Sequence, residues 1–177
     1  SRGNLWYTST VVAGLAIPIS TTTAPRVVLW NPAGSGKNAV LARLDANYVS
    51  GTTIGGAIGL SFTANAGSAI GTAAPFSAFA EDVVGTNKFN GLFGLGDTSS
   101  VRSSSQGTNT LTAAGTWFKS LASESAMIAT SANNAYTLNY DFDGEVIVPP
   151  NVAIYVTASA ASGALLATTL SWYEVSV

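Results

Sequence analysis

The sequence contains no histidine and no cysteine, so it lacks the commonest general base and the strongest nucleophile of enzymes. Without cysteine, disulfides and thiolate–metal sites are excluded and the redox compartment is not constrained. A hydrolase using two carboxylates remains formally possible. Its candidate residues are Asp45, Asp97, Asp141, Asp143 and Glu145. Because nothing in the sequence places two of these at the required separation, we expect a protein that is not an enzyme and holds no cofactor.

Charge is also scarce. Charged residues make up 9% of the chain, against about 25% in a typical soluble domain. Ala, Ser, Thr, Gly and Asn replace them and give a neutral, hydrogen-bonding surface. Such a surface suits packing against other protein, because few charges must be desolvated and few long side chains immobilised. We therefore expect an assembly subunit, with a lone soluble domain as the alternative.

Several partners are not expected. The seven basic residues are scattered from Arg2 to Lys119, and the net charge is −2, so no basic stripe is available to neutralise the phosphates of nucleic acid. No apolar run approaches the roughly 20 residues of a membrane span. The first residues lack the basic-then-apolar order of a signal peptide, so we expect a soluble protein without an export signal.

Two segments alternate with the period of a β-strand, and 177 residues are enough for one domain with a substantial core. In 38–49, one face carries Val40, Ala42, Leu44, Ala46 and Tyr48, and the other carries Arg43, Asp45 and Asn47. In 54–63, Ile54, Ile58, Leu60 and Phe62 alternate with Gly55, Ala57, Gly59 and Ser61. Both segments are predicted to be half-buried strands.

Further strands are predicted from segments rich in Val, Ile, Thr and aromatic residues, separated by turns rich in Gly, Pro, Asn and Asp. They are 5–13, 15–20, 26–31, 125–131, 135–140, 145–148, 152–158 and 165–177. About ten short strands at this spacing predict a single all-β domain, built as an antiparallel sandwich or a barrel.

The middle of the chain, about 64–110, is dense in Gly, Ser and Ala but carries Phe76, Phe79, Phe89 and Phe93. A disordered linker would seldom hold four phenylalanines. We therefore expect an ordered excursion that covers one end of the sandwich or contacts a neighbour, with 76–84 as a candidate short helix. A loop that folds over its own core is the alternative.

Two motifs suggest ligands. Residues 34–37, Gly-Ser-Gly-Lys, resemble part of a phosphate-binding loop, but Asn31 and Asn38 stand where the motif needs Gly and Ser or Thr, so we predict a tight turn. Residues 141–145 place three carboxylates at alternate positions, as a calcium site would need, yet Asp-Gly is also a common hairpin turn. We predict no metal there.

The aromatic residues could form a sugar-binding platform, although most aromatics in a sandwich fill the space between the sheets. Trp30 and Trp172 lie inside strong strand patterns and are predicted to be core. Trp6 and Trp117 flank weaker segments and are better candidates for exposed contacts.

Several phrases of the sequence resemble those of small virion proteins of tailed bacteriophages. They are VLWNPAGSG at 28–36, NAGSAIG at 65–71, YDFDGEVIVPP at 140–150 and SWYEV at 171–175. The chain is most similar to cement, or decoration, proteins of the phage head, over roughly 26–75 and 138–177.

The resemblance implies a jelly-roll sandwich, commonly a homotrimer, that sits on the outer surface of the capsid over junctions between major capsid proteins. It supplies no catalytic motif. We expect a structural virion protein, and a receptor- or glycan-binding head-fibre or tail protein is the alternative. The candidate interface residues are Leu5, Trp6, Tyr7, Phe76, Phe79, Phe89 and Phe93.

Overall fold

The computed structural model describes residues 4–51, 56–64, 75–92, 99–106, 108–123, 137–161 and 163–177. Within these ranges the chain forms fourteen β-strands and no helix, so the prediction of an all-β protein is confirmed. No helix in the described ranges is long and apolar enough to span a membrane.

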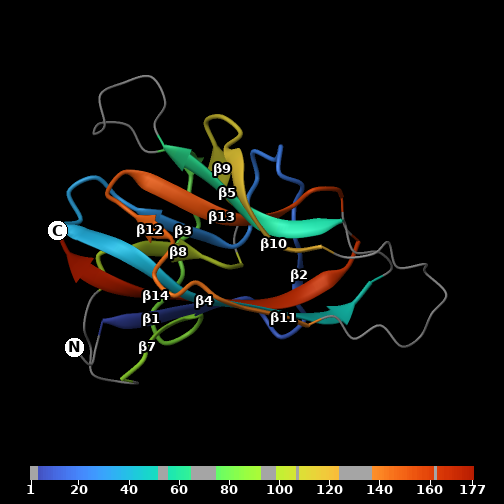
Figure 1. The fold of residues 1–177 in the computed structure, drawn as a ribbon, viewed down its shortest axis with the longest axis horizontal. Helices are drawn as coiled ribbons and strands as arrows, with labels where there is room; N and C mark the ends of the chain where they lie inside the picture. Colours follow the sequence, from blue (N-terminus) through green and yellow to red (C-terminus); the bar gives the residue numbers. More distant parts are fainter. Residues whose placement is uncertain are drawn as a thin grey trace.

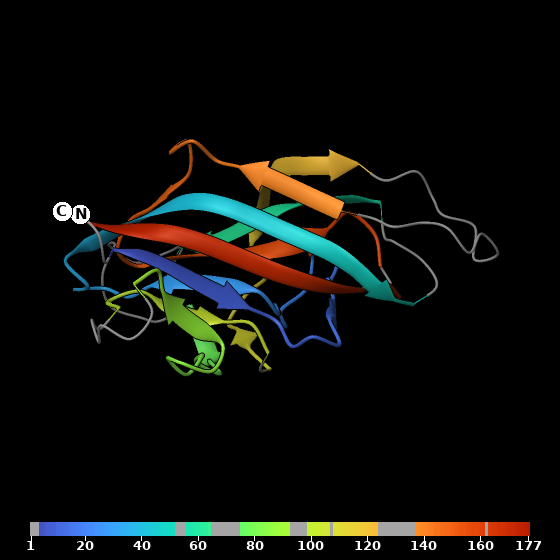
Figure 2. The same cartoon turned by 90° about the horizontal axis from the view of Figure 1, so that it is seen from below.

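The strands form two antiparallel sheets that pack face to face (Figure 1). Sheet A has the order β11 (Thr137–Asp141), β4 (Lys37–Ser50), β14 (Leu165–Ser176), β1 (Leu5–Ser9) and β7 (Lys88–Asn90), with β12 (Ile147–Val148) also on β4 and β2 (Leu15–Ala16) on β14. Sheet B has the order β10 (Thr116–Ser123), β5 (Ala57–Ala64), β13 (Val152–Ala158), β3 (Val28–Asn31) and β8 (Arg102–Ser104). A small third sheet pairs β6 (Phe76–Ala78) with β9 (Thr110–Leu111). Figure 2 looks onto the strands of sheet A.

The strand pairs are nested. β1 pairs with β14, β3 with β13, β4 with β11 and β5 with β10, so each pair lies inside the previous one along the chain. Successive pairs alternate between sheet A and sheet B. A long hairpin folded over in this way is a jelly roll, and the predicted sandwich of jelly-roll type is confirmed.

The core between the sheets follows the predicted alternation of β4 with one change of phase. Leu44 and Ala46 are buried, as predicted. The pairing with β14 then shifts by one residue at Ala42, which forms a β-bulge. Beyond the bulge Leu41 is buried and Val40 faces outward, so the prediction that Val40 shares a face with Leu44 is wrong.

The other predicted strands are mostly present with shorter bounds. In β5, Ile58 and Leu60 are buried and Phe62 packs against the core, as predicted. The strand predicted at 5–13 ends at Ser9, because a turn closed by the bond from Gly14 N to Val11 O follows. The segment 125–131 and residues 54 and 55 lie outside the described residues. β10 was not predicted.

The outer face of sheet B is covered by the described part of the middle excursion. Phe76 of β6 and Leu111 of β9 pack on Val28, Trp30 and Tyr155 to form a second apolar cluster, and Phe79 lies against it. The excursion also adds β7 to the β1 edge of sheet A and β8 to the β3 edge of sheet B. The alternative of a loop folded over its own core is therefore the one that these residues follow.

The candidate helix at 76–84 is wrong. Residues 76–78 form β6, and Phe76 lies opposite Leu111 in the small sheet. The rings of Phe76 and Phe79 reach Trp30 at centroid distances of 5.6 and 5.3 Å. Burial of these rings against sheet B decides the local conformation, and their spacing of three residues does not require a helix.

Candidate interaction surface

The structure separates the predicted interface residues into three groups. Trp6 is 2% exposed, because β1 is paired on both sides and its ring points into the core. The expectation of an exposed Trp6 is therefore wrong. Leu5 and Tyr7, its neighbours on β1, face the other way and are half-buried, and Phe89 lies directly opposite Tyr7 on β7.

The remaining predicted aromatics lie elsewhere. Phe76 and Phe79 pack within the chain on sheet B, and Phe93 lies outside the described residues. Trp30 and Trp172 are core residues, as predicted, with 8% and 0% exposed. Trp117 is half-buried, and its ring lies against the backbone of Gly59.

An apolar row crosses the outer face of sheet A. Leu5 lies opposite Tyr173, Tyr173 opposite Val40, and Val40 opposite Ile147, so the row runs unbroken over β1, β14, β4 and β12. Tyr173 is 42% exposed and Ile147 56% exposed. Val175, on the same face of β14, is also exposed. Contiguous exposed apolar surface of this kind marks interaction sites in soluble proteins.

The next part of the same face is polar. Arg43 donates to Asp45 at 2.8 Å and lies 3.4 Å from Asp141, its partner on β11. The hydrogen bond and charge of Asp45, with the charge of Asp141, raise the pKa of the Arg43 guanidinium. Two of the candidate hydrolytic carboxylates are therefore held by a cation on an open sheet face, and Asp97 lies outside the described residues.

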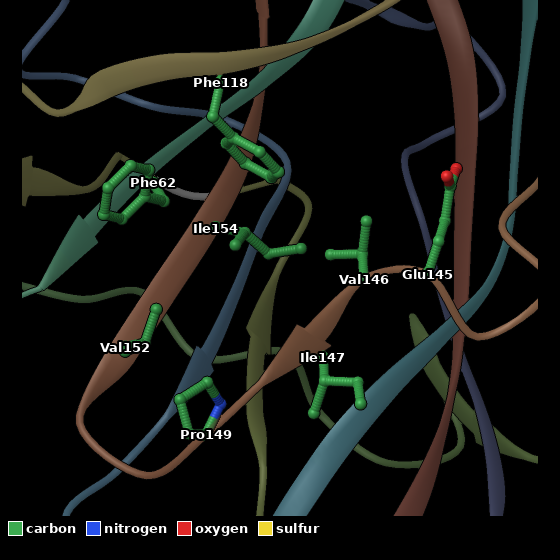
Figure 3. Close-up of a pocket in the computed structure, with 8 residues that line it drawn as sticks. All are labelled: Phe62, Phe118, Glu145, Val146, Ile147, Pro149, Val152 and Ile154. Atoms are coloured by element: carbon green, nitrogen blue, oxygen red, sulfur yellow. The ribbon is translucent and has the colours of Figure 1, made fainter.

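A pocket of about 350 Å³ opens beside the apolar row, where the edge of sheet B meets the segment leading into β12 (Figure 3). The rings of Phe62 and Phe118 meet edge to face at 5.6 Å on one side of it. Ile147 belongs both to the apolar row and to the pocket, so the two surfaces are continuous. Apart from Glu145 the lining is apolar: Phe62, Phe118, Val146, Ile147, Pro149, Val152 and Ile154.

Glu145 stands at the rim of the pocket. Its Oε1 accepts hydrogen bonds from Lys119 Nζ at 2.9 Å and from the Tyr140 hydroxyl at 2.8 Å. These two contacts, Lys119 first, lower the pKa of Glu145. The pKa of Lys119 is raised by its hydrogen bonds with Glu145 and, second, with Tyr140. The carboxylate therefore stays ionised at lower pH than an ordinary glutamate.

The acidic segment 141–145 forms a tight turn, but the interpretation of Asp-Gly as a hairpin turn is wrong, because β11 and β12 on either side of it both pair antiparallel with β4 and therefore run in the same direction. Glu145 N donates to Phe142 O, and Asp143 and Gly144 both have positive φ, 48° and 81°, as a type I′ turn requires. Asp141 faces Arg43 and Glu145 faces Lys119, so the carboxylates point to different partners. In the described ranges, no three acidic side chains are placed to hold a metal.

The Gly-Ser-Gly-Lys segment is a tight turn, as predicted. Ser35 N donates to Pro32 O, and Gly34 and Gly36 have positive φ. The following residues, from Lys37, form β4 and not the helix that a phosphate-binding loop must open.

Three buried charged side chains were missed by the sequence patterns. Asp82, on the segment before β7, accepts hydrogen bonds from Thr8, Asn87, Ser103 and from both the amide and the hydroxyl of Ser105. It therefore joins β1, β8 and the excursion at the side of the sandwich.

Lys88 and Glu174 lie close by, 2% and 5% exposed. Lys88 Nζ donates to Val101 O at 2.6 Å, and Glu174 accepts from Ser100 N at 3.0 Å and from Ser99. Burial lowers the pKa of Lys88, against the opposing effect of nearby carboxylates, Glu81 the foremost. These contacts fasten the excursion to β14, and all three charged groups are enclosed by the chain itself.

The site therefore consists of the apolar row, the adjoining pocket and its acidic rim. The two-residue period of the segment 165–177 already implies that Tyr173 and Val175 face away from Trp172. The alignment of the row across four strands could be seen only from the pairing register of those strands in the structure.

Comparison of the chain with protein-family models, with curated proteins and with solved structures found no significant match in any of the three.

Proposed function

We propose that the chain is a structural virion protein: a decoration, or cement, protein that binds the major capsid protein on the outer surface of a tailed-bacteriophage head and associates with itself as a homotrimer. The apolar row on the outer face of sheet A is the observation that carries this proposal. Sheet B uses its outer face to hold the chain's own excursion, whereas the row exposes Tyr173 and Ile147 on a rigid sheet.

The composition of the face supports the same function. Beyond the row, the outer face of sheet A presents small polar side chains, one ion-paired group around Arg43, and the half-buried Tyr7 with Phe89 opposite it. Such a face loses little on desolvation when it packs against another protein. Three linked copies on a three-fold site would add roughly 10²- to 10⁴-fold in avidity where geometry permits.

The jelly roll supports the proposal at the level of fold alone, because capsid proteins, lectins and cupins share this architecture. Its rigidity suits a protein that reinforces a shell. Binding through a contact area that is spread over paired strands does not require a reactive side chain.

The test is to mix the protein with undecorated heads of its phage and measure bound protein by co-sedimentation. We expect saturable binding at a fixed number of copies per head. Tyr173→Asp should reduce it at least tenfold, whereas Asn47→Asp, the same charge change on an exposed polar part of sheet A, should not. Absence of saturable binding by the wild type would overturn the proposal.

A receptor- or glycan-binding virion protein is the rival, and the exposed Phe118 ring beside Glu145 is the feature that favours it. Specific ligand sites place several polar groups around their apolar walls, whereas this pocket has one carboxylate that already binds Lys119. Strong hits in a glycan screen, without capsid binding, would support the rival.

We also propose that the chain is not an enzyme. The carboxylates Asp45 and Asp141 share Arg43 on an open face, where water is not excluded. Turnover of any polysaccharide that a single Asp or Glu substitution abolishes would contradict this.

A further inference from the structure

We infer that the pocket beside Glu145 receives the end of β14 from a second copy of the chain, with Tyr173 as the anchoring side chain. The inference rests on the proposed self-association and names its contact. Three properties of the pocket and the adjoining turn have a counterpart at the end of β14: apolar surface, a free hydrogen-bonding atom and uncompensated charge.

The apolar surfaces match in kind. The pocket of about 350 Å³ has an exposed mouth formed by Phe118 and Ile147, which are 42% and 56% exposed, over a buried floor at Ile154. The end of β14 presents Tyr173 and Val175, 42% and 49% exposed, on one face of a paired strand. Buried aromatic anchors in pockets are the residues that dominate protein–protein binding energy.

The hydrogen-bonding atoms are complementary. Lys119 and Tyr140 both bond Oε1 of Glu145, which leaves Oε2 without a partner among the described residues. The Tyr173 hydroxyl likewise has no partner in the part of the chain that the structure describes. A tyrosine whose ring enters the pocket can donate this hydroxyl to Oε2, since an ionised carboxylate only accepts hydrogen bonds.

The turn that carries Glu145 and the neighbouring part of sheet A have excess negative charge beside the pocket. Four carboxylates gather at this edge of the sandwich, and Arg43 and Lys119 are the two cations that they contact, which leaves two negative charges uncompensated. The carboxylates are Asp45, Asp141, Asp143 and Glu145. Asp143, at the tip of the turn, makes no ion pair with any described residue.

The end of β14 carries the matching cation. Lys37 lies opposite Ser176 and donates to its hydroxyl at 3.0 Å, and it has no carboxylate partner in the described ranges. The other described cations do not combine free charge with exposed apolar neighbours. Arg43, Arg102 and Lys119 are ion-paired, Lys88 is buried, and Arg26 lies between buried Pro25 and Val27.

The proposed homotrimer requires a head-to-tail contact, in which the pocket of each copy receives the end of β14 from the next copy. A head-to-tail contact closes into a ring when its rotation allows, and a rotation near 120° gives a trimer. Each copy then contributes one anchor and one pocket, and Asp143 of one copy faces Lys37 of the next.

The experiment measures the oligomer's dissociation constant by light scattering over a concentration series. We expect Tyr173→Ala to raise it at least tenfold and Tyr173→Phe, which keeps the ring and loses the hydroxyl, a few-fold. Lys37→Gln and Asp143→Asn should each raise the dissociation constant a few-fold. The double variant should raise it no further than the single variant with the larger effect, because the effects of two residues that contact each other do not add. Asn tolerates the positive φ at position 143, so the turn is preserved. Arg26→Gln combined with Asp143→Asn is the control pair, and its effects should simply add.

Unchanged association in Tyr173→Ala, additive effects of the Lys37 and Asp143 variants, or a wild type that is monomeric at every concentration would each overturn the inference. Circular dichroism confirms that each variant is folded. Binding of the wild type to undecorated heads is measured independently, so a failure here is distinguishable from failure of the proposed decoration role.

Discussion

Trp6 on β1 and Trp172 on β14 lie directly opposite each other, and both rings point into the core beneath the ammonium group of Lys88. Lys88 Nζ lies 5.5 Å from the centroid of Trp6 and 5.9 Å from that of Trp172. β1 is thus held by pairing on both of its sides and by a buried cation, so Trp6 contributes to the stability of the fold and not to an exposed contact.

Trp6→Ala should lower the free energy of unfolding by about 3–5 kcal/mol, the usual range for removing a large buried aromatic side chain. Leu5→Ala is the matched control, because Leu5 is the neighbouring residue on the outer face and is half-buried. Its effect should be clearly smaller. Urea denaturation monitored by circular dichroism measures both, and a loss below about 1 kcal/mol for Trp6→Ala would contradict the assignment of Trp6 to the core.

The burial of Lys88 predicts how the free energy of unfolding depends on pH. Burial lowers its pKa in the folded state, so between that lowered pKa and its ordinary value of about 10.4 the unfolded chain binds more protons than the folded one. The free energy of unfolding should therefore rise with pH across this window, relative to that of Lys88→Met. Denaturant titrations of both proteins from pH 7 to 10.5 give the difference, and a flat difference would show that Lys88 keeps an ordinary pKa.

The alternating segments made much of the fold predictable, and the failures have identifiable causes. Leu44, Ala46, Ile58 and Leu60 are buried as their period predicts, whereas the bulge at Ala42 reverses Val40. An alternating sequence pattern does not show where a β-bulge interrupts the strand. β10 escaped prediction because it is irregular, with register shifts near Lys119 and Ala122.

The candidate site was less predictable than the fold. Leu5 and Tyr7 were identified by their position near the chain start, but the alignment of Leu5 with Tyr173 depends on pairing between residues far apart in sequence. Asp82 and Lys88 looked like ordinary surface charges in the sequence. Their burial follows from the excursion folding back on β1, which local patterns do not encode.

Asp82→Ala should destabilise the protein by about 3 kcal/mol or more, because it leaves the buried Ser103 hydroxyl and Ser105 amide without their acceptor. It also removes one of the two acceptors of the Thr8 and Ser105 hydroxyls. Glu81→Ala is the control, since Glu81 is exposed and forms a surface ion pair with Arg102. Limited proteolysis should cut Asp82→Ala faster than the wild type within 75–106. Equal cleavage and equal stability would show that the Asp82 contacts do not hold the excursion.

Gly59→Ala should destabilise the sandwich by about 1–3 kcal/mol through overpacking. A Cβ at position 59 would lie 2.2 Å from Lys119 O and 2.4 Å from the Trp117 ring, so β10 would have to move away from β5. At Gly91 the nearest atom to an added Cβ is at 3.4 Å, so Gly91→Ala should be tolerated. Thermal melting compares the two, and equal melting temperatures would contradict the close contact between β5 and β10.

The most direct test of the proposed role is the temperature at which undecorated phage heads release their DNA, measured with and without a saturating amount of this protein. A cement protein that acts through contact area predicts a higher release temperature, and Tyr173→Asp at the same concentration should give little of that increase. An unchanged release temperature with the wild-type protein bound would contradict the account.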